Sequence, residues 1–398
     1  MEQNKFNFDE IIDRKGTNSL KWDSFDSKSY PDILPMWVAD MDFKTDPAII
    51  EKMQEIVSRG IFGYNIVPDE WYDAIIKHWE TAHLTSIKKE WLIFCNGVVP
   101  AITSAIKRLS NVGDNVVTLT PTYDIFFHSI ENTGRHVVEC PLKCNDIGYY
   151  YLDYKLLEKQ LQDPNARILL ISNPHNPTGK RFDKEEMSYI ETLCRNNNVI
   201  LISDEIHCDI SMYDYTSALQ NPYSCKMVVC LSASKAFNLA GLQSAAIVIP
   251  DKNINDIVNR GLNSDELAEP NSFAIASTIA AFEKESVWLS ELNKYIDNNK
   301  NFAIDYMKEN CPELKIAVSS FGSTYLLWIN CGYPIAIPFS DYLLKYKGLA
   351  VCPGTQYRGT NANNFIRINI ACPMERLKEG LDRLVEGYYE FIEDFTNC

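Results

Sequence analysis

Four short segments of the 398-residue sequence gather side chains that could act on a bound small molecule. Each lies at the end of an apolar run, and they are FCNGVVP at 94–100, NPHNPTG at 173–179, DEIH at 204–207 and SASKAFN at 232–238. They supply an amine nucleophile (Lys235), a carboxylate (Asp204), an amide (Asn176) and a glycine-led helix start whose N–H groups favour an anion. Taken singly, they are equally explained as a surface amine, a helix cap, a turn former and a loop glycine. Their combination indicates a binding site.

The apolar runs that precede these segments predict the element that positions them. Short β-branched runs recur between helix-length stretches at 115–119, 167–172, 199–203, 227–231 and 245–249. Strands that are apolar on both faces and separated by helices are typical of a mostly parallel sheet sandwiched by helices, an α/β fold. Ligands of such sheets bind beyond the carboxyl ends of the strands. The four segments are therefore expected to meet at one edge of the sheet.

The pattern changes near residue 285, where longer charged helices (289–310 and 375–393) enclose strands at 324–329 and 364–370. In the second strand, alternation places Arg367 and Asn369 on one face and isoleucines on the other. We expect a large domain over 46–284, beginning at the helix start Asp46-Pro47, and a smaller α+β domain over 285–398. The segment 1–45 is expected to contribute to the small domain and to the substrate entrance.

Composition excludes several classes of function. The formal net charge of −15, without a basic patch, disfavours nucleic acid and anionic membrane partners. No apolar stretch resembles a membrane span or a secretory signal, so a cytoplasmic location is expected. The 12 cysteines contain no C-x-x-C pair and the 6 histidines no H-E-x-x-H spacing. No metal site is therefore predicted, and the cysteines are expected to be reduced.

The motifs resemble a known superfamily. N-P-H-N-P-T-G at 173–179, S-D-E-I-H at 203–207 and S-x-S-K-x-F-N-x-A-G-L at 232–242 resemble the fold-type I aminotransferases, which depend on pyridoxal 5′-phosphate. The block PMWVADMDF at 35–43, together with DEIH, resembles the cystathionine β-lyase (C–S lyase) branch of MalY/PatB type. The likeness spans nearly the whole chain and implies the PLP-dependent transferase-like fold, with 46–284 as the cofactor-binding domain.

The resemblance implies roles for the residues around the cofactor ring. Lys235 would bind the cofactor covalently and then remove the substrate α-proton. Asp204 would pair with the pyridine nitrogen, and Asn176 would donate to the phenolic oxygen and contact substrate. His207 stands near that oxygen or is a structural histidine. Tyr123 would stack on the ring, unless it is a plain core tyrosine.

The resemblance also implies a phosphate site. Backbone N–H groups of Gly97, Val98 and Val99 would bind the phosphate, with the hydroxyls of Ser232 and Ser234 as further donors. Of the two hydroxyls, that of Ser232 is the surer phosphate donor.

Other positions concern the substrate and a second subunit. Arg367 would clamp the substrate α-carboxylate, unless it forms an outward-facing salt bridge, and Ala39 would contact the substrate. Tyr64 resembles a tyrosine that reaches the phosphate of the partner subunit, which implies a homodimer; otherwise it is a loop aromatic. The role of Asn96 stays open, and Arg358 either alters the pocket mouth or faces solvent.

The predicted reaction is α,β-elimination of L-cystathionine or another S-substituted L-cysteine to pyruvate, ammonia and a thiol. An aminotransferase of class I/II is the alternative enzyme, because loss of the α-proton permits either outcome. A second alternative is a PLP-binding regulatory protein that acts through a protein partner. The complete set of Lys235, Asp204 and Arg367 favours catalysis over that last function.

Overall fold

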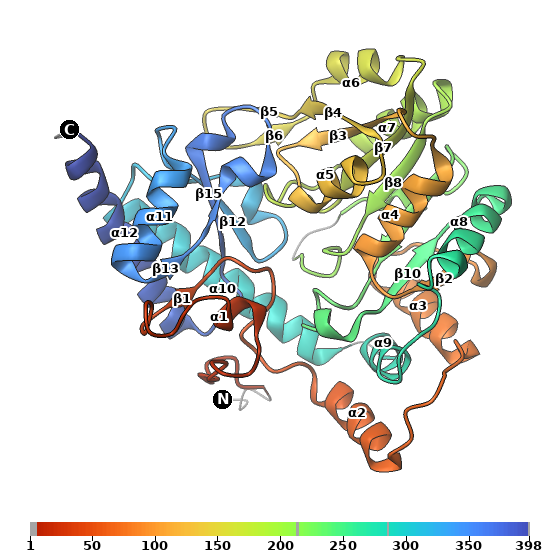
Figure 1. The fold of residues 1–398 in the computed structure, drawn as a ribbon, viewed down its shortest axis with the longest axis horizontal. Coiled ribbons are helices and arrows are strands. Elements are labelled where there is room, and N and C mark those ends of the chain that lie inside the picture. The colour runs from red at the N-terminus through yellow and green to blue at the C-terminus, as the bar shows by residue number, and fades with distance from the viewer. Residues whose placement is uncertain (1–5, 212–214, 285, 397–398) are drawn as a thin grey trace.

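The computed structural model describes residues 6–211, 215–284 and 286–396. Its centre is a seven-stranded sheet with the strand order β2-β10-β9-β8-β7-β3-β4 (Figure 1). The strands are β2 (Leu92–Cys95), β3 (Asn115–Thr120), β4 (His136–Pro141), β7 (Ala166–Ser172), β8 (Ile200–Asp204), β9 (Met227–Leu231) and β10 (Ala245–Val248). The apolar runs of the sequence thus form adjoining strands of one sheet.

The sheet is mostly parallel. The five strands from β4 to β9 pair in parallel, whereas β10 pairs antiparallel with both β9 and β2. Parallel neighbours need a crossover connection, usually an α-helix, and the segment between β9 and β10 contains only the short 3-10 helix Ala240–Leu242. The chain therefore returns antiparallel. The α/β fold class predicted from the sequence is confirmed.

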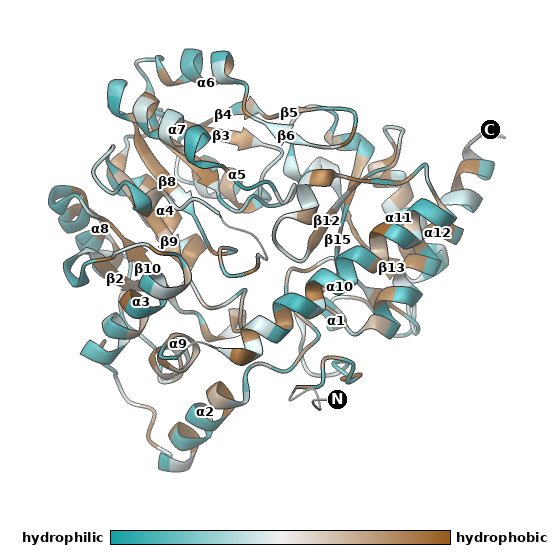
Figure 2. Cartoon of the chain, turned by 180° about the vertical axis from the view of Figure 1, so that it is seen from behind, coloured by the Kyte–Doolittle hydropathy of each residue, from teal (hydrophilic) through white to brown (hydrophobic). Residues whose placement is uncertain are grey.

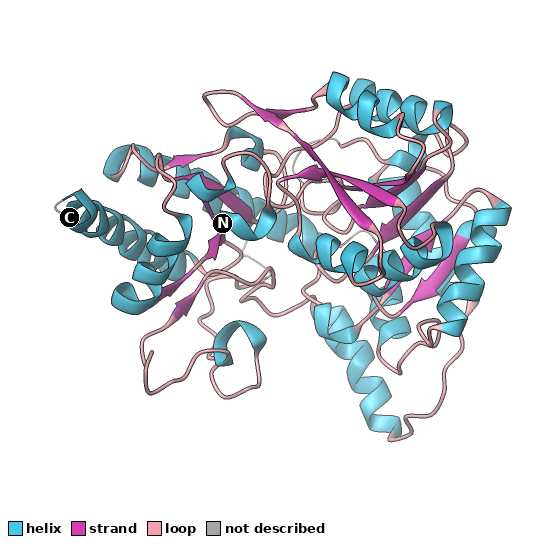
Figure 3. Ribbon diagram, turned by 45° about the horizontal axis from the view of Figure 1, so that its top comes forward, coloured by secondary structure: helices cyan, strands magenta, loops and turns pink. Residues whose placement is uncertain are grey.

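Helices cover both faces of this sheet (Figure 3). They are α3 (Asp69–Ala82), α4 (Val98–Leu109), α5 (Asp124–Glu131), α6 (Tyr154–Leu161), α7 (Lys184–Asn196), α8 (Lys252–Ser264) and α9 (Ala274–Phe282). Helix α2 (Pro47–Arg59) lies farther out and packs against α9 (Figure 1). Figure 2 shows apolar central strands and polar colour on outer helices such as α6 and α8. No helix in the described ranges has the length and apolar character of a membrane span.

A smaller antiparallel sheet follows, with the order β11-β12-β15-β14. Its strands are β11 (Lys315–Ile316), β12 (Leu326–Asn330), β14 (Cys352–Pro353) and β15 (Phe365–Asn369), and the helices around it are α10 (Val287–Asn310), α11 (Ala336–Lys347) and α12 (Met374–Thr396). Both strands predicted from the sequence are present, as β12 and β15. Residue 285, where the small domain is predicted to begin, lies outside the described residues.

The N-terminal segment lies against the C-terminal part of the chain. Helix α1 (Leu20–Asp23) precedes β1 (Leu34–Pro35), which pairs in parallel with β13 (Leu349–Ala350). The buried carboxylate of Asp42 ties the segment together, because it accepts from Lys21 Nζ at 2.9 Å and Arg14 Nη1 at 2.8 Å. This packing brings residues 37–41 beside β15 and the segment after β9.

A hairpin and an exposed connection extend from the large domain. A two-stranded hairpin of β5 (Lys143–Cys144) and β6 (Tyr150–Tyr151) follows β4. The connection between α2 and α3 runs along the outer edge of the molecule, where Tyr64 is 98% exposed (Figure 1). Ile61, Phe62 and Ile66 of the same connection are also exposed.

Candidate active site

A cavity of about 510 Å³ lies where the N-terminal segment, the ends of β7, β8 and β9 and the strand β15 meet. Nearly all of the site residues predicted from the sequence line it: Ala39, Gly97, Val98, Val99, Tyr123, Asn176, Asp204, His207, Ser234, Lys235 and Arg367. They come from parts of the chain up to 328 positions apart, between Ala39 and Arg367. The fold therefore brings together groups that the sequence keeps separate.

Lys235 follows β9 and points its amine at the N-terminal segment. Its Nζ donates to the carbonyl of Ala39 at 2.8 Å, and the hydroxyl of Tyr325 donates to the same oxygen at 3.0 Å. Burial and the positive charge of Arg367 lower the pKa of Lys235 to about 8, against the opposing effects of Asp40 and Asp204. About a tenth of the amine is therefore uncharged at pH 7 and can act as a nucleophile.

Asp204 is the last residue of β8, and its side chain is buried. Its Oδ1 accepts one backbone hydrogen bond, from Ile206 at 3.1 Å. Burial raises the pKa of Asp204 to about 7, although the N–H of Ile206 and the charge of Lys235 act to lower it. A carboxylate in this position would be stabilised by a cationic ligand group in the cavity.

Arg367 and Asn176 meet in the wall of the same cavity. Arg367 Nη1 donates to Asn176 Oδ1 at 3.1 Å, and Nη2 donates to the carbonyl of Trp37 at 2.6 Å. The guanidinium lies 5.1 Å from the ring centroid of Tyr357, and its Nε has no hydrogen-bond partner. Because it faces the cavity, Arg367 is not the outward salt bridge that the sequence also allowed.

His207 and Tyr123 are two further ring side chains of the cavity wall. Burial, with the charges of Lys235 and Arg367, lowers the pKa of His207 to about 3, so the imidazole is neutral. Its Nδ1 has no partner. Burial, and secondarily Asp124, raises the pKa of Tyr123 to about 12, so its hydroxyl is protonated. Both side chains can therefore bind an aromatic ligand without adding charge.

The start of α4 forms the anion-binding end of the cavity. Gly97 has φ +151°, a conformation restricted essentially to glycine, and the helix begins at the next residue. The first N–H groups of a helix have no partner inside it and favour an anion. Ser234, Gln243 and the buried, unpartnered Oδ1 of Asn96 line the same cavity.

Three predicted positions lie elsewhere. Ser232 is absent from the cavity wall: its hydroxyl donates to the carbonyl of Ser244 at 2.6 Å and accepts from the N–H of Ser234 at 3.1 Å. The hydroxyl of Ser232 is thus engaged in the turn after β9, and its expected role as a phosphate donor stays a prediction. Tyr64 lies at the outer edge of the chain. Arg358 pairs with Glu131 at 2.9 Å, away from the cavity wall.

Sequence reasoning missed several residues that shape the cavity. Tyr325 acts through its hydroxyl and lies in a predicted strand without a chemical motif. Trp37 lies in the block at 35–43 but acts through its backbone carbonyl, which no residue type announces. Gln243 also lines the cavity. It lies only a few residues after the S-x-S-K motif, and this closeness to Lys235 in the sequence is the signal that could have identified it.

The residues present fit pyridoxal phosphate. An anion site at the start of α4, the amine of Lys235 and the carboxylate of Asp204 line one cavity, as a phosphate, an aldehyde and a ring nitrogen require. The unpartnered atoms Asn96 Oδ1, His207 Nδ1 and Arg367 Nε provide additional polar contacts for a ligand.

Comparisons with known proteins agree with this arrangement. Residues 31–384 match the family model described as aminotransferase class I and II. Cystathionine β-lyase PatB of Bacillus subtilis (strain 168) is 35% identical over 385 residues, which cover 95% of this chain and 98% of PatB. Protein MalY of Escherichia coli (strain K12) is 32% identical over 389 residues, covering 96% and 98%. The structure of the PLP-bound C–S lyase from Staphylococcus hominis is similar with TM-score 0.89 and 30% identity, covering 97% and 99%.

Proposed function

The chain belongs to the aminotransferase class I and II family, and from this premise we propose that it is a pyridoxal phosphate-dependent carbon–sulfur lyase. Its substrate is L-cystathionine or another S-substituted L-cysteine. The products are a thiol, pyruvate and ammonia. The observation that carries the proposal is that Lys235 and Asp204, from the ends of neighbouring strands, line one cavity with an anion site and Arg367.

Lys235 holds the cofactor and then accepts the substrate α-proton. When bound, pyridoxal phosphate withdraws electrons from the substrate α-carbon and so makes that proton removable. With a pKa of about 8, about half of the Lys235 amine is uncharged at pH 8, against about 0.3% for the ordinary value of 10.5. Burial beside Arg367 therefore prepares this lysine for nucleophilic attack.

The other side chains orient the two ligands. Asp204 gives the ring nitrogen an anionic partner and keeps it protonated. The N–H groups of Gly97, Val98 and Val99, with the hydroxyl of Ser234, bind the phosphate. Arg367 binds the substrate α-carboxylate through its unpartnered Nε and through the Nη2 that now contacts Trp37.

The lyase outcome follows from the relatives. Once the α-proton has moved to Lys235, the electron pair of that C–H bond can form a double bond to the β-carbon, and the C–S bond breaks with its electrons on sulfur. Hydrolysis of the resulting unsaturated amine gives pyruvate and ammonia. The relatives named cystathionine β-lyase and C–S lyase match over nearly their full length, which supports this outcome over amino transfer.

We also propose that the chain acts as a homodimer in which Tyr64 reaches the partner's site. Tyr64 is 98% exposed and its neighbours Ile61, Phe62 and Ile66 form an exposed apolar stretch. Apolar side chains gathered in this way are typical of an interface between subunits. Tyr64 is placed at the periphery of its own subunit, which suits a contact outside that subunit.

The test of the lyase proposal is a product assay on the purified, cofactor-loaded protein. With L-cystathionine, we expect pyruvate and free thiol in equal amounts. Lys235→Ala should abolish both, whereas Lys226→Ala, which changes an exposed lysine just before β9, should leave the rate unchanged. Amino transfer to a 2-oxo acid without thiol release would refute the lyase and identify an aminotransferase.

A further inference from the structure

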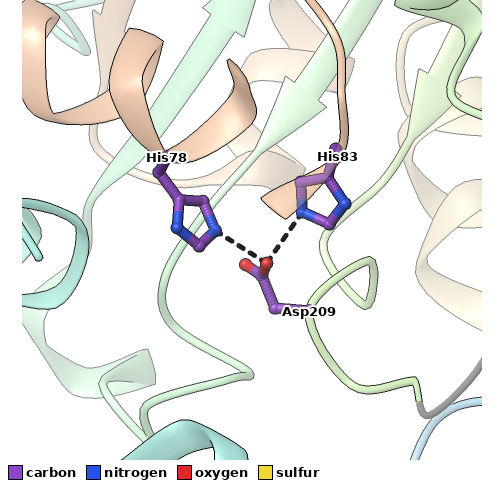
Figure 4. A group of neighbouring side chains, drawn as sticks. All are labelled: His78, His83 and Asp209. Carbon is purple, nitrogen blue, oxygen red and sulfur yellow. Dashed lines mark hydrogen bonds and ion pairs between the residues drawn. The ribbon is translucent and has the colours of Figure 1, made fainter. Parts of the chain in front are cut away.

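A second group of functional side chains lies outside the Lys235 cavity. His78 Nε2 and His83 Nε2 each lie 2.8 Å from the same carboxylate oxygen, Asp209 Oδ1 (Figure 4). One potential ligand atom from each residue lies within 4.8 Å of the other two. Figure 4 shows the two rings approaching the carboxylate from different sides. Two imidazoles and one carboxylate thus converge on one point.

Each ring is held by packing. His78, on α3, stacks on Phe282 with a centroid distance of 4.4 Å and an interplanar angle of 23°. His83, the residue after α3, lies 4.5 Å from the ring centroid of Trp79. The backbone carbonyl of Asp209 accepts from Asn293 Nδ2 at 2.9 Å. These contacts hold the three residues in place without involving the Nε2 atoms of the two histidines, which therefore stay directed at Asp209.

The cluster borders its own cavity. The side chain of His78 is 10% exposed, that of His83 9% and that of Asp209 5%. All three line a cavity of about 660 Å³. Among the described residues, none that lines this cavity also lines the Lys235 cavity. A ligand bound to the three side chains would be largely shielded by protein but reachable from one side.

We propose that His78, His83 and Asp209 bind a divalent transition metal ion of the zinc type. Two imidazole nitrogens and one carboxylate oxygen are a donor set for Zn²⁺, whose Zn–N and Zn–O bonds are roughly 2.0–2.2 Å. In the bound form each neutral imidazole carries its proton on Nδ1 and turns the Nε2 lone pair to the ion. Ligand atoms about 3.3 Å apart suit tetrahedral coordination. The two 2.8 Å contacts to Asp209 Oδ1 would open by about 0.5 Å, and all three ligand atoms already lie within 4.8 Å of one another.

The donor set selects against other ions. Mg²⁺ and Ca²⁺ prefer ligands that are all oxygen, whereas imidazole suits zinc and its neighbours in the transition series. Three protein ligands leave a fourth position, which faces the 660 Å³ cavity and is open to water. The ion would link the end of α3 to the segment that follows β8, because Asp209 is five residues after Asp204.

The first experiment uses the unmodified, cofactor-loaded protein. After treatment with a chelator, titration with ZnCl₂ by calorimetry should show one saturable site per chain, and MgCl₂ should show none. X-ray absorption at the zinc edge should show only nitrogen and oxygen neighbours near 2.0–2.1 Å. A sulfur neighbour near 2.3 Å would place the ion on cysteine and overturn the proposal, as would the absence of saturable binding.

Variants then locate the site. In His83→Gln and Asp209→Asn, zinc affinity should fall by more than the ~10–100-fold typical of losing an outer-shell partner. The matched control is His136→Gln, which changes an exposed histidine of β4 and should bind zinc as the parent does. Zinc at 100 times its Kd should raise Tm by about 3 °C in the parent and the control only. Equal affinity in all three variants would refute the assignment.

Discussion

Replacing Asp204 by asparagine should stabilise the cofactor-free protein and destabilise the loaded one. In the free protein, burial raises the pKa of this carboxyl group from 3.8 to about 7. The folded state then binds one more proton than the unfolded state between these two pKa values, so stability falls as the pH rises through that window. At 1.36 kcal/mol per pKa unit, the loss between pH 4 and pH 8 is about 4 kcal/mol. Asp204→Asn carries no ionisable group and escapes this loss.

The assay is thermal unfolding of both proteins, with and without cofactor, from pH 4 to pH 8. With about 2.1 cal/mol/K of unfolding entropy per residue, about 4 kcal/mol corresponds to a Tm difference of about 5 °C for a chain of 398 residues. As the pH rises from 4 to 8, the Tm of the cofactor-free variant should come to exceed that of the cofactor-free parent by this difference. In the loaded proteins the order should reverse, because only the carboxylate can pair with a protonated ring nitrogen.

Glu205 provides the matched control, because it is an equally buried carboxylate that already has donors. It accepts hydrogen bonds from Ser203, Ser217, Tyr215 and the N–H of Ala218. Glu205→Gln should therefore destabilise the protein with and without cofactor. If Asp204→Asn is destabilised to the same extent in both forms, the carboxylate is a structural group and the reasoning about its ligand fails.

Two further predictions concern the subunit interface and the substrate. Chains carrying Tyr64→Ala and chains carrying Lys235→Ala should each be inactive alone. Mixing the two after dissociation should restore activity, because one of the two sites in the hybrid dimer has both residues intact. No recovery would mean that Tyr64 does not act across the interface. Arg367→Lys keeps the charge but loses the forked geometry that binds a carboxylate through two bonds. It should lower kcat/KM for L-cystathionine by about 10- to 100-fold, mainly through KM, with an unchanged cofactor absorbance band. An unchanged KM would remove Arg367 from the substrate site.

The fold and the family could be predicted from the sequence because their signals are local. A run such as Met227–Leu231 is apolar throughout, and its five residues are all buried in the centre of the sheet. The motif at 232–242 fixes the lysine and its neighbours within one short segment. The fold class and the superfamily are confirmed, whereas the domain limits and the individual site roles stay predictions.

Features that depend on distant partners could not be predicted in the same way. The antiparallel direction of β10 depends on whether the segment that connects it to β9 forms a crossover helix. The hydroxyl of Ser232 donates to a carbonyl twelve residues away. His78 and His83 are five positions apart, a spacing without a metal motif, and their third partner is 126 residues beyond His83. Such a cluster exists only once the chain has folded.

The N-terminal segment connects the electrostatics of the cavity to substrate binding. Backbone carbonyls of Trp37 and Ala39 accept hydrogen bonds from Arg367 and Lys235, the two cations of the site. A substrate α-carboxylate would replace the neutral carbonyl on Arg367 with a charged acceptor, and charge-assisted hydrogen bonds are roughly twice as strong as neutral ones. The exchange is therefore favourable, and it frees the carbonyl of Trp37 from the cavity wall. Substrate binding and a local shift of residues 37–39 should accordingly occur together.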